Sequence, residues 1–316
     1  MQEIELKFQI PQRALQTLQE SMGQLAGSGR EHLQAHYFDT PDRRLGQARS
    51  ALRLRKEGSR WVQTLKAVGA NTMIRLEDNQ PASAPAEGQA AKIDLGLHRG
   101  GAAEASLTKA LDWQADADPR GDRTGLVELY RTDIWRHSAR MAVGQGTAFE
   151  GVVELALDLG HIQAGELSLP VRELEIELAE GHPMAVILAA RDWVSRHGLW
   201  LDTRTKAHRG DRLARQAAGE PPADPRRKAS AADLASALED LTDAMSLVAL
   251  GEHDIDRALQ QWRQALHGLA SLTTPPQVMP AVAGLIQALD HSNSPIELAR
   301  SPSSTLLCLD LFAALL

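Results

Sequence analysis

Apolar and polar side chains alternate with period two in several segments that precede residue 217. Because successive side chains of a strand point to opposite faces, these segments are predicted strands with one apolar and one polar face. They lie around residues 52–55, 74–77, 154–158 and 173–178. The clearest segment opens the chain as MQEIELKF, and its two faces carry Glu3, Glu5 and Lys7 against Ile4, Leu6 and Phe8.

Helical spacing appears in two places within this region, at residues 13–25 and 184–197. After residue 230 it dominates, and leucine-rich stripes at intervals of three and four residues predict the amphipathic helices of a bundle. We predict four helices there, the last ending at Leu316. Their start signals are Ser230 with Asp233, Asp254, and Ser294 and Pro295 with Glu297.

Two stretches have the composition of connections. Residues 79–88 read NQPASAPAEG, and residues 217–230 read AAGEPPADPRRKAS. Proline, glycine and small polar residues favour turns and loops over helices or strands. We therefore predict a first domain over residues 1–216, a linker over residues 217–229 and a helical domain over residues 230–316.

The net charge of −7 is unevenly distributed along the 316 residues. Residues 229–316 contain ten acidic residues and three arginines, so this part carries the whole −7 and the remainder is neutral. An acidic helical part argues against a polyanionic partner there. Only 4% of the residues are aromatic, which leaves few stacking platforms for bases, so we expect no nucleic-acid partner.

Cys308 is the single cysteine, which excludes an internal disulfide and a cluster of thiolate metal ligands. The amino terminus is charged, unlike a signal peptide. The longest apolar run, residues 306–316, is too short to cross a bilayer and contains Asp310. We therefore expect a cytoplasmic protein without a membrane partner.

The charged strand faces hold carboxylates and cations together. A closed sheet with helices outside would gather them in one interior, and burying charges without partners is costly. A ligand with many negative charges and bound divalent cations would balance both sets. Carboxylate oxygens suit Mg²⁺ or Mn²⁺, and arginine and lysine side chains suit phosphate oxygens. The pattern favours a metal–polyphosphate site, while the opening strand taken alone fits a solvated polar face equally well.

Nine segments, in order, resemble the CYTH family of triphosphate tunnel metalloenzymes, and especially its bacterial inorganic triphosphatases. They are EIELKF at 3–8, HYFDTPDRRL at 36–45, ALRLRKEG at 51–58, TLK at 64–66, RLE at 75–77, RTDIWR at 131–136, ELALDLGHIQAG at 154–165, RELEIELAEG at 172–181 and TKAHRG at 205–210. The first segment alone is a weak signal. Nine ordered segments across residues 1–210 are a specific one.

The resemblance implies an α+β fold: an antiparallel eight-stranded β-barrel, which forms a tunnel with charged walls and flanking helices, followed by the all-α bundle. It implies that Mg²⁺ or Mn²⁺ is bound by Glu3, Glu5, Glu173 and Glu175, with Glu154 or Asp158 assisting. It implies that the triphosphate is held, and its hydrolysis assisted, by Lys7, Arg53, Arg55, Lys66, Arg136 and Lys206. Arg75 and Glu77 match a pair that lines the tunnel, and Arg75 is assigned to the substrate.

Some neighbouring residues have competing structural interpretations. Asp158 fits a turn before Gly160 equally well, and Glu177 fits the tunnel rim better than a metal site. Lys206 and Arg209 are assigned to or near a strand, and Arg209 is interpreted as an exposed loop residue.

Other residues are assigned structural roles only. Residues 39–42, which read DTPD, are interpreted as a turn. His36 is assigned to a strand rather than to a ligand set. Trp262 follows a helical stripe and is assigned to the core of the bundle.

The leading functional interpretation is metal-dependent hydrolysis of inorganic triphosphate to diphosphate and phosphate. A class IV-type adenylate cyclase and a thiamine-triphosphatase are alternatives at the same site. A base or thiazolium ring should meet aromatic groups near the tunnel mouth, and few aromatic residues lie in or beside the matching segments: Tyr37, Phe38, Trp61 and Trp135. A polyphosphate-binding module without turnover is a third alternative, against which the large carboxylate set argues.

Related triphosphatases often carry a second helical domain, called CHAD, that is rich in histidine and basic residues. The helical part of this chain has the corresponding place, but it is acidic and contains only His253, His267 and His291. We interpret it as a diverged or shortened CHAD-like domain and assign no phosphate binding to it. Its apolar stripes predict either packing against the tunnel domain or a homodimer contact.

Overall fold

The computed structural model describes residues 2–71, 73–86, 89–101, 104–221, 233–251, 255–272 and 278–316, without the side chains of residues 2, 68–71 and 75. Its strands are β1 (Gln2–Gln9), β2 (Gly29–Asp39), β3 (Ala51–Glu57), β4 (Arg60–Asn71), β5 (Ile74–Ala82), β6 (Val127–Val143), β7 (Gly151–Ala164), β8 (Leu167–Gly181) and β9 (Trp200–Leu201). Its α-helices are α1 (Leu15–Gly23), α2 (Arg44–Gln47), α3 (Glu104–Leu111), α4 (Met184–His197), α5 (Lys206–Ala217), α6 (Leu234–Leu250), α7 (Ile255–Ser271), α8 (Met279–Asp290), α9 (Pro295–Ala299) and α10 (Pro302–Ala313), with short 3₁₀ turns at Gln12–Ala14 and Leu95–His98.

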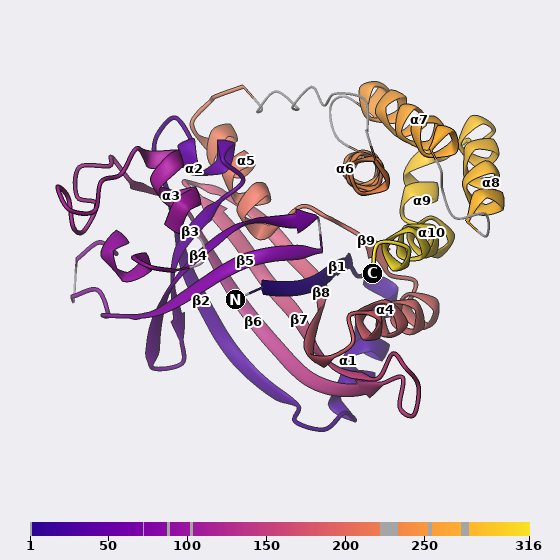
Figure 1. The fold of residues 1–316 in the computed structure, drawn as a ribbon, viewed down its shortest axis with the longest axis horizontal. Helices are drawn as coiled ribbons and strands as arrows, with labels where there is room; N and C mark the ends of the chain where they lie inside the picture. Colours follow the sequence, from indigo (N-terminus) through magenta and orange to yellow (C-terminus); the bar gives the residue numbers. More distant parts are fainter. Residues whose placement is uncertain are drawn as a thin grey trace.

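Within the described ranges, nine strands form one antiparallel sheet in the order β5-β4-β3-β2-β6-β7-β8-β1-β9. Residues 2–4 of β1 also pair with β5, so that β1 to β8 form a closed ring. β9 is added beside the last residues of β1. The predicted antiparallel barrel with flanking helices and a helical carboxyl-terminal region is confirmed, and β9 is a strand that the sequence did not predict (Figure 1).

The outer face of β1 and β8 packs against α4. Leu6, Phe8 and Ile176 are buried, and they share one apolar cluster with Val186 and Trp193 of α4. Since side chains alternate along a strand, this packing turns the charged residues of β1 and β8 toward the inside of the ring. The alternation in the opening segment therefore serves a buried interior and not a solvated face.

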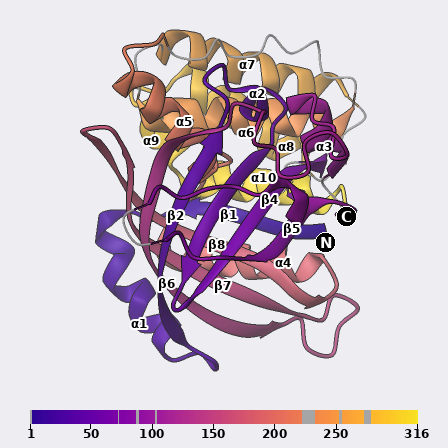
Figure 2. The same ribbon diagram turned by 90° about the vertical axis from the view of Figure 1, so that its left-hand side faces the viewer.

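The helices α6 to α10 lie together on one side of the sheet, next to β9 and α4 (Figures 1 and 2). Their core residues Leu241 and Trp262 belong to the same apolar cluster as Leu201 of β9. In addition, the backbone N–H of Leu201 donates a hydrogen bond of 3.1 Å to Thr305 Oγ1. The structure thus agrees with packing against the tunnel. The homodimer contact stays a prediction, as does the division into two domains, because one core contains residues of both parts.

Two predictions about the first region are wrong. Residues 79–82 belong to β5 and not to a connection, because Thr64 Oγ1 donates to Asn79 Oδ1 and the pairing with β4 continues to Ala82. The segment around Lys206 begins α5 and not a strand. Thr205 provides the reason, since its side chain accepts the N–H of His208 as a helix cap.

The helical region also differs from the prediction. The expected fourth helix is interrupted after Ala299, because the side chain of Ser301 caps a new helix that starts at Pro302. Asp233, rather than Ser230, caps α6. Ser230, Asp254 and most of the predicted linker lie outside the described residues. None of the helices in the described ranges combines the length and the apolar character needed to cross a bilayer.

Candidate active site and metal centre

Charged side chains from separate strands meet inside the closed ring. Glu3 and Glu5 are each 6% exposed, and Lys7 is 7% exposed. The ammonium group of Lys66 on β4 lies 2.9 Å from the carboxylate of Glu3 on β1 and 3.0 Å from that of Glu77 on β5. Burial opposes ionisation of Glu77, but Lys66 and Arg53 outweigh it and lower its pKa to about 2. These ion pairs join the strands where the ring closes.

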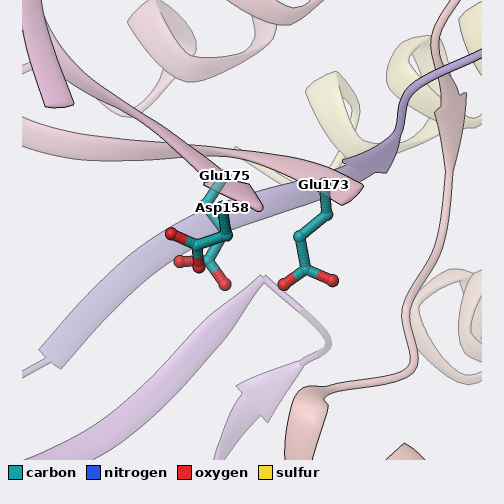
Figure 3. A group of neighbouring side chains, drawn as sticks. All are labelled: Asp158, Glu173 and Glu175. Atoms are coloured by element: carbon teal, nitrogen blue, oxygen red, sulfur yellow. The ribbon is translucent and has the colours of Figure 1, made fainter. Parts of the chain in front are cut away.

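Three carboxylates, two of them buried and one half-buried, form the most compact acidic group in the described part of the chain (Figure 3). They belong to Asp158 on β7 and to Glu173 and Glu175 on β8, and oxygens of the three lie within 4.8 Å of one another. Lys206 of α5 makes ion pairs with all three, at 2.6 Å from Asp158 and 2.9 Å from Glu175. We name this group the inner acidic cluster.

Further cations neutralise the inner acidic cluster. Arg136 donates two hydrogen bonds of 2.7 Å to Asp158 and a third to Glu175. Lys7 lies 3.3 Å from Glu175, and Arg209 pairs with Glu173. Burial opposes ionisation of Glu175, but Lys206, Lys7 and Arg136 hold its pKa well below the usual range. In this state the carboxylates are occupied by protein cations.

A second group of carboxylates is less well neutralised, and we name it the acidic pole: Glu3, Glu5 and Glu177. Glu5 and Glu177 are direct cross-strand partners, and Glu154 of β7 is the next residue across the sheet. Burial, together with the charges of Glu3 and Glu5, raises the pKa of Glu177 to about 8. Burial and the neighbouring Glu5 and Glu77 raise the pKa of Glu3 to about 7, against the effect of Lys66.

The acidic pole fits a divalent metal ion in its donor chemistry. All of its ligand atoms are carboxylate oxygens, which hard cations such as Mg²⁺ and Mn²⁺ prefer. Like charges that are forced together across strands also raise one another's pKa, and a bound cation would relieve that repulsion. The inner acidic cluster is more compact, but its arginine and lysine partners already supply the positive charge.

Guanidinium groups gather elsewhere on the inner face, and we name them the basic pole: Arg53, Arg55 and Arg136. Burial and the charges of Arg53 and Arg136 lower the pKa of Arg55 below its usual value. Arg53 is hydrogen-bonded to Tyr37 Oη at 3.4 Å, and its buried Nε atom has no partner among the described residues. Half-buried arginines gathered in this way fit a ligand with several anionic oxygens.

Helix α5 covers one end of the ring. Leu213 and Ala214 of α5 share an apolar cluster with Tyr130, Ile134 and other inward residues of β2, β6, β7 and β8. Asp211 Oδ1 accepts a 2.7 Å hydrogen bond from Nε of Arg43, which lies after β2. This placement carries Lys206, the first residue of α5, to the inner acidic cluster.

The structure brings the predicted site residues together, except for Arg75, whose side chain is not described. Their inward side chains meet in the poles, in the inner acidic cluster or in the Lys66 ion pairs. Glu154 is half-buried on the same face of β7 as Asp158. The side chain of Arg75 lies outside the described part, although its backbone pairs with Glu3. The structure assigns positions to these residues, and their roles remain proposals.

Two structural interpretations of charged residues are wrong. Arg209 is not an exposed loop residue, because it lies on α5, is buried and pairs with Glu173. Asp158 does not shape a turn, because it lies within β7, is fully buried and binds Arg136. The sequence signal for Arg209 was the capping Thr205, since a helix that starts there puts residues 206 and 209 on one face.

The purely structural assignments are confirmed. Asp39 holds the turn that follows β2 by accepting the backbone N–H groups of Thr40, Leu45 and Gly46 at 2.7–2.8 Å. His36 lies in β2 and contacts Glu128. Trp262 is fully buried in α7.

Residues 1–210 match the sequence profile of the CYTH domain. The chain belongs to the CYTH family. The match spans every strand of the closed ring and the start of α5, and it ends before the helical region. This family includes adenylate cyclases and triphosphatases, and its members act on substrates that carry a triphosphate.

The solved structures to which this chain is similar are distant from it in sequence. A candidate adenylate cyclase from Bacillus halodurans is 21% identical, with 61% of this chain and 88% of that chain covered and a TM-score of 0.37. HpAC1 from Hippeastrum, described as a candidate adenylyl cyclase with a dominant triphosphatase activity, is 19% identical, with 70% and 98% covered and a TM-score of 0.40. The PH1819 protein from Pyrococcus horikoshii is 17% identical, with 64% and 94% covered and a TM-score of 0.40.

Proposed function

We propose that this CYTH protein hydrolyses inorganic triphosphate to diphosphate and phosphate in a reaction that depends on Mg²⁺ or Mn²⁺. The proposal rests on one observation: the inside of the closed ring holds both a group of crowded carboxylates, the acidic pole, and a group of crowded arginines, the basic pole. The charges of Glu3 and Glu5 raise the pKa of Glu177, and the charges of Arg53 and Arg136 lower the pKa of Arg55. These like charges remain crowded even though Lys66 pairs with Glu3, and Arg136 pairs with Asp158. A metal–triphosphate complex satisfies both groups at once.

The basic pole would hold the phosphate oxygens. Arg53 and Arg55 offer planar donor sets, and the unpaired Nε of Arg53 marks one position for an acceptor. Lys7, Lys206 and Arg136 would exchange their carboxylate partners for phosphate oxygens when substrate enters. Such an exchange frees Asp158, Glu173 and Glu175 as additional oxygen ligands.

Metal ions held by the acidic pole, with Glu154 beside it, would offset the charge of the phosphate oxygens and lower the pKa of a bound water. The chain itself binds and orients the phosphates in this scheme. Helix α5 and its apolar cluster close one end of the ring and limit access of bulk water there.

The positions of the aromatic residues support inorganic triphosphate over a nucleotide. Tyr37 points inward, but its ring stacks on Tyr130 with centroids 4.7 Å apart. Trp135 is 44% exposed and stacks on His32. Trp61 packs near His36. These rings are engaged with each other or lie outside the charged interior, so they offer no platform for a base beside the poles.

The decisive assay is a substrate panel. Phosphate release would be measured with tripolyphosphate, ATP and thiamine triphosphate, each with Mg²⁺ and with Mn²⁺, and cyclic AMP would be measured in the ATP reactions. We expect the highest kcat/KM with tripolyphosphate and no turnover without metal. A preference for ATP with cyclic AMP formation would reject the proposal in favour of a cyclase, and tight tripolyphosphate binding without turnover would leave a binding module.

Two carboxylates of β8 provide a matched pair of variants. Glu177→Gln should lower kcat/KM by about 100-fold or more, because it removes a carboxyl group that would become an anionic oxygen ligand when a metal ion binds at the acidic pole. Glu180→Gln makes the same chemical change three residues further along, where the side chain is 72% exposed and pairs loosely with Arg140. It should retain near-normal activity. Glu5→Gln should abolish metal-dependent turnover with the fold intact, and full activity in that variant would remove Glu5 from the metal site.

A further inference from the structure

The four residues between β9 and α5 are tied to the strand that opens the chain. The backbone N–H of Asp202 donates to the carbonyl oxygen of Lys7 at 3.0 Å. The carboxylate of Asp202 accepts the side-chain amide of Gln9, also at 3.0 Å. The first residue of this connection, which spans residues 202–205, is therefore hydrogen-bonded to the backbone of Lys7, a lysine proposed to bind phosphate. We name it the α5 connection.

An internal ion pair keeps the α5 connection in one conformation. Arg204 donates to Asp202 from its backbone N–H at 3.0 Å, from Nε at 2.9 Å and from Nη2 at 2.7 Å. Asp202 is 1% exposed and Arg204 is 8% exposed. Neither charge can move to solvent without leaving the other buried and unpaired, which is costly.

Two side chains of α6, in the helical region, accept hydrogen bonds from the same connection. The backbone N–H of Thr203 donates to Ser246 Oγ at 3.2 Å, and its hydroxyl donates to Asp243 Oδ1 at 3.1 Å. Asp243 and Ser246 are three residues apart on α6, so they present their side chains on one face of that helix. Ser246 is buried, so its hydroxyl meets Thr203 in place of water.

The α5 connection is followed directly by α5, which carries Lys206 and Arg209. Thr205 caps α5, and its hydroxyl accepts the N–H of His208 at 3.0 Å. Lys206 follows as the first residue of the helix and reaches the inner acidic cluster, and Arg209 follows one turn later. A lysine side chain is long and flexible, so the position of its backbone decides which oxygens it can reach.

We propose that Thr203, Asp243 and Ser246 are positioning residues for Lys206, and that α6 is thereby part of the working structure of the tunnel. The helical region, which the family match does not cover, holds the start of α5 in the register that places Lys206 at the inner acidic cluster. The consequence for catalysis rests on the proposed function, but the positioning itself does not.

Hydrogen exchange in the full-length, ligand-free protein tests the positioning directly. Thr203→Val removes the hydroxyl donor with little change of shape, and Ser246→Ala removes the acceptor on α6. Both should speed exchange of the His208 and Arg209 amides by about three- to tenfold, through easier local opening of the first turn of α5. Unchanged protection of these amides in both variants would overturn the proposal.

A matched control separates positioning from a general loss of stability. Thr305→Val removes a different hydrogen bond of the helical region, the one that Leu201 N–H makes at 3.1 Å. It should lower the melting temperature by about 2–6 °C and speed exchange at Leu201, while the first turn of α5 stays protected. Thr203→Ser keeps both donors and should behave as the natural protein.

A double-mutant cycle tests the consequence for catalysis. Thr203→Val should lower kcat/KM for tripolyphosphate by about tenfold in the natural background, and by less than twofold in a Lys206→Met background, because it acts through Lys206. Additive losses would overturn the catalytic part of the proposal. Absence of any turnover in the natural protein would defeat the proposed function, and hydrogen exchange would still decide whether α6 positions Lys206.

Discussion

Gly210 of α5 lies where this helix packs on Tyr130 of the ring. A Cβ atom at this position would lie 2.2 Å from Cε2 of Tyr130. The Tyr130 ring cannot retreat easily, because it stacks on Tyr37 and its hydroxyl donates to the Ala207 carbonyl at 3.1 Å. Gly210→Ala must therefore move α5 away from the ring, and Lys206 with it.

The magnitude follows from two opposing terms. Alanine is favoured over glycine inside a helix by about 1 kcal/mol, and overpacking of this kind costs about 3 kcal/mol. We expect Gly210→Ala to lower the free energy of unfolding by about 2 kcal/mol, measured by urea denaturation. Because α5 shifts, kcat/KM for tripolyphosphate should fall by about tenfold or more.

Gly284 provides the control for this reasoning. It lies in α8, and a Cβ atom there would meet no atom within 4 Å. Gly284→Ala should raise the free energy of unfolding by about 0.5–1 kcal/mol through helix propensity alone. If Gly210→Ala is stabilised as much as Gly284→Ala and keeps full activity, then the contact between α5 and Tyr130 does not seal the ring and the argument fails.

Three further outcomes can be measured. Burial lowers the pKa of His98 despite its contact with Asp78, so the unfolded chain binds the proton more readily than the folded one. The free energy of unfolding should therefore fall as the pH drops below about 6.5. In urea denaturation between pH 8 and 5, His98→Asn should show a weaker dependence on pH, and the same dependence in both proteins would refute this. Arg209→Met leaves the fully buried Glu173 with fewer cations and should cost about 3 kcal/mol in urea denaturation, a loss that a near-neutral variant would contradict. A chain that ends at Gly219 should expose apolar core, bind a hydrophobic dye and lose its cooperative melt; an unchanged melting temperature without dye binding would show that the helical region adds nothing to stability.

The sequence by itself determined which residues face the interior. Period-two alternation is a property of the local backbone, so the EIELKF segment and residues 173–178 separate their charged and apolar faces wherever the strands are placed. The carboxylates on those faces were enough to indicate a metal site, and the arginines were enough to indicate a polyphosphate ligand. The exposed Arg209 and the turn at Asp158 were wrong because both interpretations considered only neighbours along the chain.

The tertiary structure alone decided which charges meet. Glu5 and Glu177 oppose each other because β1 and β8 pair in one register, and a shift of one residue would place them on opposite faces. Arg209 reaches Glu173 because α5 packs over the end of the ring, and this packing depends on the contact between Gly210 of α5 and Tyr130 of β6. The energy of a charge pair depends on the distance between the two charges in space. That distance is set by how the strands and helices pack, and the periodicity of the sequence does not contain this information.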